Sequence, residues 1–355
     1  MTERAKRILV PSAGGPGCVN LCRSLRMLPE GAFLVGADSS RYYIHLAEAD
    51  VRELIPPRSS EREWIDSVNR LVERHRLELI FPNNSLDGMV LARHREELAA
   101  PVFLPSVEAF LTGENKWETW QRVQAAGIPA PRTWLLSARQ DVEAAFASLG
   151  SGPVWVRGAG IPGRGIGVAS LPAKTVEQAV QWVEFHSGWG LMSASEYLPG
   201  ANLTWLGVFQ DGRLVASQGR QRDAYVIPHV SPSGITGAPA ISHTVRRADI
   251  NDLGPLVCRA VDRKLTGAAF VDFKEDSAGR PRVTEINVGR FGTTHHFYSV
   301  AGASFPELVL RLALGEPLPG WVRPFDVLPE GLYWIRTLDA GPVLVRGEDL
   351  ERFAS

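Results

Sequence analysis

Three oxygen-bearing side chains, Asp272, Glu285 and Asn287, fall on a stretch of the sequence with the pattern of a β-hairpin. Residues 267–275 are rich in Ala, Val and Phe, and residues 281–288 alternate in polarity and carry β-branched side chains. The residues between these two segments include Asp, Ser and Gly, which favour a turn. The pattern therefore predicts two antiparallel strands joined by a short loop.

The register of this hairpin decides whether its carboxylates meet. If the loop covers 276–281, Glu275 faces Arg282, and counting back places Asp272 opposite Glu285. Opposed residues point to the same face, and the asparagine two positions further along joins them. Two opposed carboxylates repel, so a positive group is expected between them. Three hard oxygen ligands suit Mg²⁺ bound together with substrate phosphates; the alternative is a solvated surface hairpin.

A glycine-rich segment gives the second chemical signal. Two predicted strands, 153–157 and 166–170, flank a loop in which glycines stand at 158, 160, 163, 165 and 167. The loop leads into a strand and lacks the GK[ST] ending, so it is not a Walker-type phosphate loop. A flexible flap of this kind can close its backbone N–H groups over phosphates, and Arg157 adds a fixed positive charge. A flexible hairpin tip without a ligand is the alternative.

Bulk properties exclude several classes of protein. The chain has 355 residues, a formal net charge of −1 and 45% hydrophobic residues, which is typical of a globular protein of two or three lobes. It has no basic block, so we expect no nucleic acid partner, and no run of about 20 apolar residues, so we expect no membrane span. Three cysteines without paired spacing and the absence of a signal-peptide pattern favour reduced thiols and a cytoplasmic location.

The first 110 residues alternate predicted strands, at 6–10, 32–37 and 77–81, with helical segments. This alternation predicts a parallel α/β lobe. A dinucleotide-binding loop is the tempting interpretation, because Gly15 and Gly17 begin the fingerprint and Asp38 ends the second strand. The third glycine is replaced by Asn20, which breaks the pattern, so we expect a Rossmann-like lobe that binds no dinucleotide.

After residue 110, predicted hairpins mix with helices, which indicates a separate α+β region. Lys116 lies in the first turn of a predicted helix, and Asp211-Gly212 is a strong two-residue turn between strands 203–209 and 213–217. The extended segment that follows places Arg220 and Arg222 on one side. Further helices are predicted at 252–265 and 305–314, with a strand-bearing tail from residue 319. The fold class is thus α/β plus α+β.

Taken in order, these pieces resemble the ATP-grasp superfamily. The matching features are the Rossmann-like lobe, the Lys-bearing helix, the segment Gly-Ile-Pro-x-Pro, the glycine-rich flap, the sequence Glu-Tyr-Leu-Pro-Gly, and Asp followed by Glu-Ile-Asn. Within the superfamily the chain looks most like the synthetase domains of carbamoyl phosphate synthetase, which also carry Arg before the flap, as Arg157 stands here. The resemblance implies a Rossmann-like preceding domain at 1–110, two α+β ATP-grasp subdomains at 111–193 and 194–318, and a tail at 319–355.

The resemblance also implies roles for individual residues. Lys116 and Arg157 would hold the phosphates of ATP, and the flap would be formed by Gly163, Gly165 and Gly167. Adenine would meet backbone groups of Glu196 and Leu198, and the ribose would meet Asn202, where relatives have Glu. One or two Mg²⁺ ions, with Mn²⁺ as an alternative, would be bound by Asp272, Glu285 and Asn287. The transferred phosphoryl group or the acceptor carboxylate would face Arg220 and Arg290, with Arg222 a further candidate.

The implied activity is an ATP-dependent carboxylate–amine ligase that forms a C–N bond through an acyl phosphate and releases ADP and phosphate. Its implied partners are a small-molecule carboxylate and an amine, and a homodimer is expected from relatives. Two alternatives remain: a nucleotide-binding protein without catalysis, and a dinucleotide-dependent oxidoreductase that uses the first lobe. Intact Asp272, Glu285 and Asn287 argue against the former, and the broken glycine pattern argues against the latter.

Overall fold

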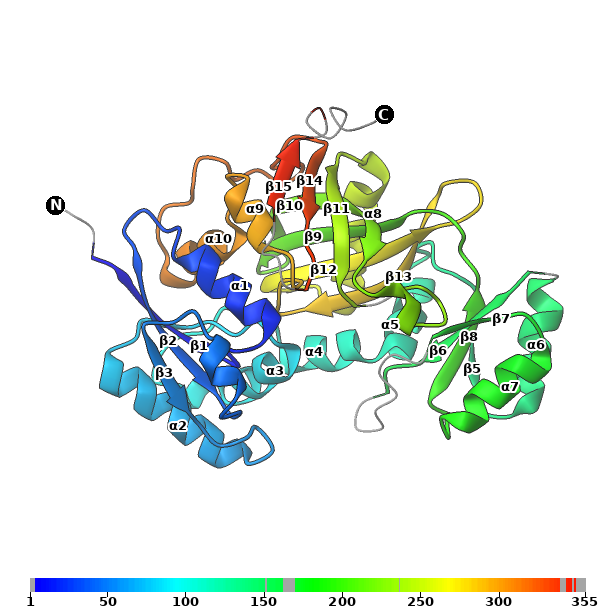
Figure 1. Cartoon of the computed structure of the whole chain (residues 1–355), viewed down its shortest axis with the longest axis horizontal. Coiled ribbons are helices and arrows are strands. Elements are labelled where there is room, and N and C mark those ends of the chain that lie inside the picture. The colour runs from blue at the N-terminus through cyan, green and yellow to red at the C-terminus, as the bar shows by residue number, and fades with distance from the viewer. Residues whose placement is uncertain are drawn as a thin grey trace.

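The computed structural model describes residues 4–150, 152–161, 170–235, 237–338, 343–346 and 348. Within these residues the strands form three sheets, spread along the molecule as Figure 1 shows. The α-helices are α1 Pro16–Leu25, α2 Glu61–His75, α3 Ser85–Arg93, α4 Val107–Glu114, α5 Lys116–Ala125, α6 Arg139–Leu149, α7 Val176–Phe185, α8 Ala248–Val261, α9 His296–Val300 and α10 Phe305–Leu314.

The strands are β1 Lys6–Pro11, β2 Ala32–Asp38, β3 Val51–Leu54, β4 Leu79–Ile80, β5 Thr133–Leu136, β6 Val154–Gly158, β7 Leu171–Ala173, β8 Met192–Glu196, β9 Asn202–Gln210, β10 Arg213–Tyr225, β11 Pro239–Val245, β12 Gly267–Glu275, β13 Pro281–Val288, β14 Leu332–Ile335 and β15 Val343–Arg346. Short 3₁₀ helices lie at η1 Tyr43–Leu46, η2 Arg95–Glu97 and η3 Pro228–Val230.

The first lobe contains a four-stranded parallel sheet with the order β3-β2-β1-β4. Strands β1, β2 and β4 lie where the sequence pattern predicts them. The pattern missed β3, an edge strand whose sequence VREL has two charged residues and carries no run of strand-forming side chains. Asp38 at the end of β2 accepts hydrogen bonds from the backbone N–H groups of Gly14 (3.1 Å) and Ser40 (2.9 Å), so its carboxylate holds the loop after β1 in place.

A seven-stranded sheet with the order β13-β12-β9-β10-β11-β14-β15 forms the centre of the molecule (Figure 1). The predicted hairpin over Asp211-Gly212 is confirmed, and both residues have positive φ, 51° and 78°. The end of the chain joins this sheet through β14, whose Trp334 is buried and contacts Phe297 of α9. The tail is therefore an integral part of the central sheet.

One face of this central sheet changes from apolar to polar side chains along its strands. Leu206 and Phe270 are buried against the first lobe and the helices α9 and α10. Two positions further along the same strands stand Thr204 and Asp272, paired directly across the sheet. Because side chains two apart on a strand share a face, the apolar core passes into a polar surface without a change of side. The opposite face, with Trp205 at its centre, packs against α8.

The hairpin β12–β13 confirms one predicted pair and corrects another. Asp272 lies opposite Glu285, as the sequence predicts, but Glu275 pairs with Pro281 and Lys274 pairs with Arg282. The prediction of a Glu275–Arg282 pair was wrong because the strands carry a bulge between Asp272 and Phe273. A bulge inserts one extra residue into one strand, which shifts the register on one side of it and leaves the other side unchanged.

A third, smaller sheet with the order β5-β8-β6-β7 is covered by α6 and α7 and has an apolar core of its own (Figure 1). Helix α8 starts at Ala248 and ends at Val261, four residues before the predicted range of 252–265 at each end. The described part of the chain has no helix long and apolar enough to cross a membrane. All three cysteines are free and buried.

Candidate active site

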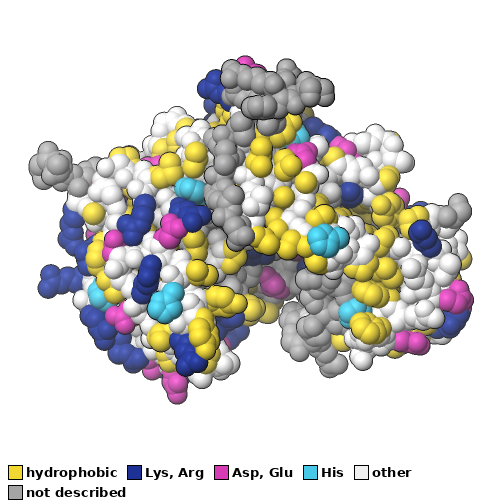
Figure 2. Space-filling view, viewed as in Figure 1, with side chains coloured by type: hydrophobic (Ala, Val, Ile, Leu, Met, Phe, Trp, Pro, Cys, Tyr) yellow, Lys and Arg dark blue, Asp and Glu magenta, His cyan; other side chains and the backbone are white. Residues whose placement is uncertain are grey.

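A cavity of about 480 Å³ lies between the small sheet and the central sheet. Figure 2 shows a notch in the surface below the central part of the molecule, between the first lobe on the left and the part with the small sheet on the right. The cavity is lined by every site residue predicted outside the flap, namely Lys116, Arg157, Glu196, Leu198, Asn202, Arg220, Asp272, Glu285, Asn287 and Arg290. The flap glycines Gly163, Gly165 and Gly167 lie outside the residues that the structure describes. A volume of this size is typical of small-molecule sites.

Glu285 stands between two cations. Its carboxylate lies 3.3 Å from Nζ of Lys116 and 3.9 Å from Nη1 of Arg157. Arg157 is fixed by a second contact, since its Nη2 donates to the carbonyl of Thr284 at 2.5 Å. Burial alone would raise the pKa of Glu285, but the charges of Lys116 and Arg157 outweigh it, and the pKa is lowered. The carboxylate is therefore ionised at neutral pH.

Asp272 is held in a similar way by the central sheet. Its Oδ2 lies 3.2 Å from Nη1 of Arg222, and its Oδ1 accepts a hydrogen bond of 2.7 Å from the hydroxyl of Thr204. The positive groups expected between the two opposed carboxylates are thus Lys116 and Arg157 on one side and Arg222 on the other. Each carboxylate has its own cation.

Asn287 and Arg290 connect this group to the first lobe. Nη2 of Arg290 donates to Oδ1 of Asn287, and its Nε donates to the hydroxyl of Ser85 at 2.7 Å. The guanidinium also lies over the ring of Phe270, 5.1 Å from its centre. Arg290 is therefore oriented by contacts from two lobes before any substrate arrives.

Lys116 is positioned by the start of α5. The side chain of Asn115 caps this helix by accepting from the backbone N–H of Glu118 at 3.1 Å. The chain after β6 passes so close to this helix start that a Cβ at Gly160 would lie 2.6 Å from the carbonyl oxygen of Glu114, and Gly160 has a φ of +69°. Only glycine fits this approach.

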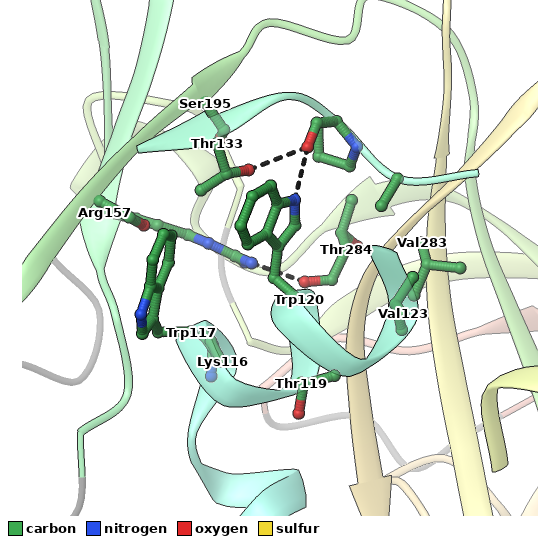
Figure 3. Close-up of a pocket in the computed structure, with 13 residues that line it drawn as sticks. Lys116, Trp117, Thr119, Trp120, Val123, Thr133, Arg157, Ser195, Val283 and Thr284 are labelled. Atoms are coloured by element: carbon green, nitrogen blue, oxygen red, sulfur yellow. Dashed lines mark hydrogen bonds between the residues drawn. The ribbon is translucent and has the colours of Figure 1, made fainter. Parts of the chain in front are cut away.

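A recess of about 30 Å³ adjoins the cavity beside α5. Figure 3 shows Arg157 extending from β6 toward Thr284, with Lys116 on the helix below. The indoles of Trp117 and Trp120 stack 4.9 Å apart, and the Trp120 N–H donates to the carbonyl of Pro131 at 2.8 Å. The bond from Trp120 ties the helix that carries Lys116 to the segment before β5.

The segment after β8 lines the far end of the cavity. The backbone N–H of Glu196 donates to the carbonyl of Arg132 at 2.9 Å, and Glu196 pairs with Val154 of β6. Leu198 is buried, and Asn202 opens β9 opposite Arg222 and Lys274. Burial and the charge of Arg222 lower the pKa of Lys274.

Arg220 occupies the same row of the central sheet, in register with Thr204 and thus with Asp272. It is only 6% exposed, and its Nη1 donates to the hydroxyl of Thr294. Burial lowers the pKa of its guanidinium, which remains charged because arginine starts from a very high value. No carboxylate of the described residues lies within 4 Å of this charge.

Sequence reasoning did not identify Ser85 and Thr204, and it left Arg222 as a lesser candidate. Thr204 could not be found because its contact with Asp272 depends on the pairing of β9 with β12, two strands that are far apart in sequence. Ser85 follows Asn83 and Asn84 at the end of a strand, and this polar run after a parallel strand was the available signal.

The oxygen ligands suit a metal ion bound together with phosphates better than a complete protein cage. Among the described residues no group of three or more His, Cys, Asp or Glu side chains is arranged as metal ligands. Asp272, Glu285 and Asn287 offer two carboxylates and one amide oxygen. Mg²⁺ is commonly held by one or two carboxylates, with water and substrate phosphates completing its coordination. Lys116 and Arg157 beside Glu285 would meet those phosphates.

Comparison with known proteins shows the fold. No family model matches the sequence, and no curated protein matches it significantly. The structure resembles the biotin carboxylase domain of 2-oxoglutarate carboxylase from Hydrogenobacter thermophilus, solved with MgADP, ADP and bicarbonate (TM-score 0.68, 15% identity, 94% of this chain and 74% of that one). It also resembles an L-amino acid ligase from Bacillus licheniformis (0.63, 16%, 94% and 79%) and N5-carboxyaminoimidazole ribonucleotide synthetase from Thermus thermophilus (0.66, 16%, 92% and 82%).

These proteins are ATP-grasp ligases, and the chain has their fold over nearly its whole length. The ATP-grasp fold that the order of motifs indicated is therefore confirmed. At these identities the likeness defines the fold, and the chemistry has to be argued from the residues of the cavity.

Proposed function

We propose that the protein is an ATP-dependent ligase that activates a carboxylate as an acyl phosphate and joins it to an amine. The observation that carries this proposal is the cavity in which Lys116, Arg157 and Arg290 surround the carboxylates of Asp272 and Glu285. A nucleoside triphosphate with a divalent cation brings both signs of charge, which this mixed arrangement complements. We also infer that the first lobe is the Rossmann-like domain that precedes ATP-grasp folds, because its parallel sheet has helices between its strands.

The reaction needs alignment and charge neutralisation more than a protein nucleophile. An oxygen of the substrate carboxylate attacks the γ-phosphorus, the bond to ADP breaks, and an acyl phosphate forms. The amine then attacks the acyl carbon, the carbon–oxygen bond breaks, and phosphate and a proton leave. When bound, Mg²⁺ would neutralise part of the triphosphate charge. Lys116 and Arg157 would bind phosphate oxygens, and Arg290 would orient the transferred group.

The similar structures support this proposal. The biotin carboxylase domain was solved with MgADP, and the other two proteins named above are an L-amino acid ligase and a ribonucleotide synthetase. That domain was solved as a dimer, so we expect a homodimer to be the first assembly to test by sedimentation. Three buried free thiols fit the reducing cytoplasm.

The test is a screen for ADP release with Mg²⁺-ATP, pooled small carboxylates and pooled amines. We expect ADP release that needs a carboxylate, rises with an amine and stops when EDTA removes the metal. Binding of ATP without ADP release in any pool would favour the alternative of a nucleotide-binding protein. Failure to bind Mg²⁺-ATP at all would overturn the proposal.

A further inference from the structure

Arg220, which lines the cavity, and Arg336, which bonds to the lining residues Pro239 and Thr293, have no acidic partner among the described residues. Nη1 of Arg220 donates to the hydroxyl of Thr294. Arg336, just after β14, donates from Nε to the carbonyl of Pro239 at 2.9 Å and from Nη2 to the hydroxyl of Thr293 at 3.5 Å. Among the described residues no carboxylate lies within 4 Å of either guanidinium, whereas the neighbouring Arg222 is paired with Asp272. Neutral hydroxyls and carbonyls thus hold both charges.

This arrangement is costly for the protein without a ligand. Burying an ionised group without a counter-charge is unfavourable, and two such groups close together repel. Burial lowers the pKa of Arg336, and the charge of Arg220 lowers it further. Adjacent threonines, Thr293 and Thr294, bring the two guanidinium groups to the same loop. An anion between them would supply the missing charge.

Gly292 leaves Arg220 accessible from the cavity. A Cβ placed on this glycine would have a single neighbour within 4 Å, Nη2 of Arg220 at 3.5 Å. Gly292, Thr293 and Pro239 all line the 480 Å³ cavity, so this side of the arginine faces the space where a substrate would lie. The φ of Gly292 is outside the left-handed region, so the backbone does not require glycine here. The missing side chain instead keeps a path open to the guanidinium.

The Nε atom of Arg220, on the side away from the large cavity, faces a second, smaller cavity. Its Nε, Nε2 of His295 and the hydroxyl of Tyr298 are buried with no hydrogen-bond partner in the described part of the chain, and all three residues line this second cavity of about 10 Å³. That volume holds about one water molecule. His295 is hydrogen-bonded at Nδ1 to the carbonyl of Gly292 at 2.7 Å, so its Nε2 is the acceptor. One water can therefore bridge the rear atoms and leave Nη2 to face the cavity.

We propose that Arg220 and Arg336, with the hydroxyl of Thr293, bind a carboxylate of the substrate that does not react. This inference rests on the proposed ligase function and names its substrate class. Arg220 is two strands from Asp272, which places their Cα atoms roughly 10 Å apart at about 4.8 Å per strand. The group is either the second carboxylate of a short dicarboxylic acid or the carboxylate of an amino acid that acts as the amine.

The test compares matched probes in the presence of Mg²⁺-ATP. C3 to C6 dicarboxylates are compared with monocarboxylates of the same length, and amino acids with amines that lack the carboxylate. Affinity is measured from the shift in thermal unfolding, and turnover from ADP release. We expect one of the two carboxylate-bearing sets to bind roughly ten- to a hundredfold more tightly than its matched set, the value of charge-assisted hydrogen bonds. The set that does so identifies the source of the anion.

The variants Arg220→Gln and Arg336→Gln should abolish this preference, and Gly292→Ala should reduce it by placing a methyl group beside Nη2. The matched control is Arg213→Gln, an exposed arginine on the same strand, which should keep the preference. Affinity for Mg²⁺-ATP should be unchanged in all four proteins. A preference that survives in folded Arg220→Gln, or no preference in either set while Mg²⁺-ATP binds, would overturn this inference alone. Loss of Mg²⁺-ATP binding in the unaltered protein would overturn the proposed function instead.

Discussion

The two ends of the cavity differ in whether their charged side chains are paired with charges of opposite sign. At the end formed by β12 and β13, Glu285 lies near Lys116 and Arg157, and Asp272 is paired with Arg222. At the end formed by β10 and the loop after β13, Arg220 has no acidic partner among the described residues, and its guanidinium donates to the neutral hydroxyl of Thr294. We call these the balanced end and the unbalanced end.

This difference shows what each end is prepared to receive. A balanced end holds its carboxylates in place, and in the proposed function it would exchange some of its internal ion pairs for contacts with a metal ion and phosphates. An unbalanced end gains most from a single anion, because that anion removes an existing penalty. Both ends lie on one row of the central sheet, so the same β-pairing fixes the distance between them.

The largest expected effect comes from breaking the balanced end. Glu285→Gln removes the carboxylate between Lys116 and Arg157, so we expect ADP release to fall by roughly a hundred- to a thousandfold, the loss seen when one preorganised polar group is removed from a site. The measurement is the steady-state rate with Mg²⁺-ATP.

The matched control for Glu285→Gln is Glu275→Gln on the same hairpin. Glu275 lies 2.6 Å from Nη1 of Arg247 and accepts from the backbone N–H of Ala201 at 3.1 Å, outside the cavity. This variant should lower the unfolding temperature and retain ADP release. Near-normal turnover in Glu285→Gln would remove the metal and phosphate assignment.

The second prediction compares stability at the two ends. Arg220→Met removes a buried cation that has no acidic partner among the described residues, so we expect the free energy of unfolding without ligand to rise by about 1 kcal/mol. Arg157→Met removes a partner of Glu285 and the donor to Thr284, so we expect a fall of about 1–2 kcal/mol. Urea unfolding of both variants measures the difference. If both variants were destabilised by the same amount, the two ends would not differ in the balance of their charges.

The sequence predicted the balanced end well and the unbalanced end poorly. Asp272 and Glu285 belong to one hairpin, so short-range pattern was enough to pair them, whereas Lys116 and Arg157 were assigned to the same site through the resemblance in motif order. The Asp272–Glu285 pairing held although the Glu275–Arg282 pairing failed, because the bulge lies between the two pairs. Bulges leave no clear mark in a single sequence.

The unbalanced end depends on contacts between distant segments. Arg336 reaches Thr293 across more than forty residues, and Arg220 reaches Thr294 across more than seventy. The tail that carries Arg336 gave no chemical signal by itself, since its role follows from the pairing of β14 with β11. Fold class and sheet content could be inferred locally, whereas this neighbourhood could be seen only in three dimensions.

The third prediction concerns His295, which lies next to Arg220 in the small cavity, and the loss of stability at acid pH. Burial lowers the pKa of His295 from 6.5 to about 3. Because the folded value is the lower one, the unfolded chain binds more protons below pH 6.5, and stability falls as the pH drops from there toward 3. At pH 5 the loss is about 2 kcal/mol. The free energy of unfolding of His295→Gln should therefore change less between pH 7 and pH 5 than that of the unaltered protein.

The control for His295→Gln is His229→Gln, in an exposed 3₁₀ turn, which should follow the unaltered protein. If removal of His295 leaves the acid dependence unchanged, the residue is not the buried neutral group that the small cavity behind Arg220 requires. In that case the water bridge to the unbalanced end would lose its acceptor.

The smallest expected effect comes from removing an ion pair outside the cavity. This variant tests whether solvent exposure, and not distance, sets the strength of an ion pair. Arg139 lies 2.9 Å from Glu143 and 3.2 Å from Glu177 on the surface of the small sheet's helices, closer than Lys116 lies to Glu285. In solvent such pairs gain little, because water screens them and two long side chains lose freedom. Arg139→Ala should therefore leave the unfolding temperature and ADP release unchanged within error. A measurable fall in either would mean that distance alone sets the strength of these pairs, and the contrast between the two ends of the cavity would then need another cause.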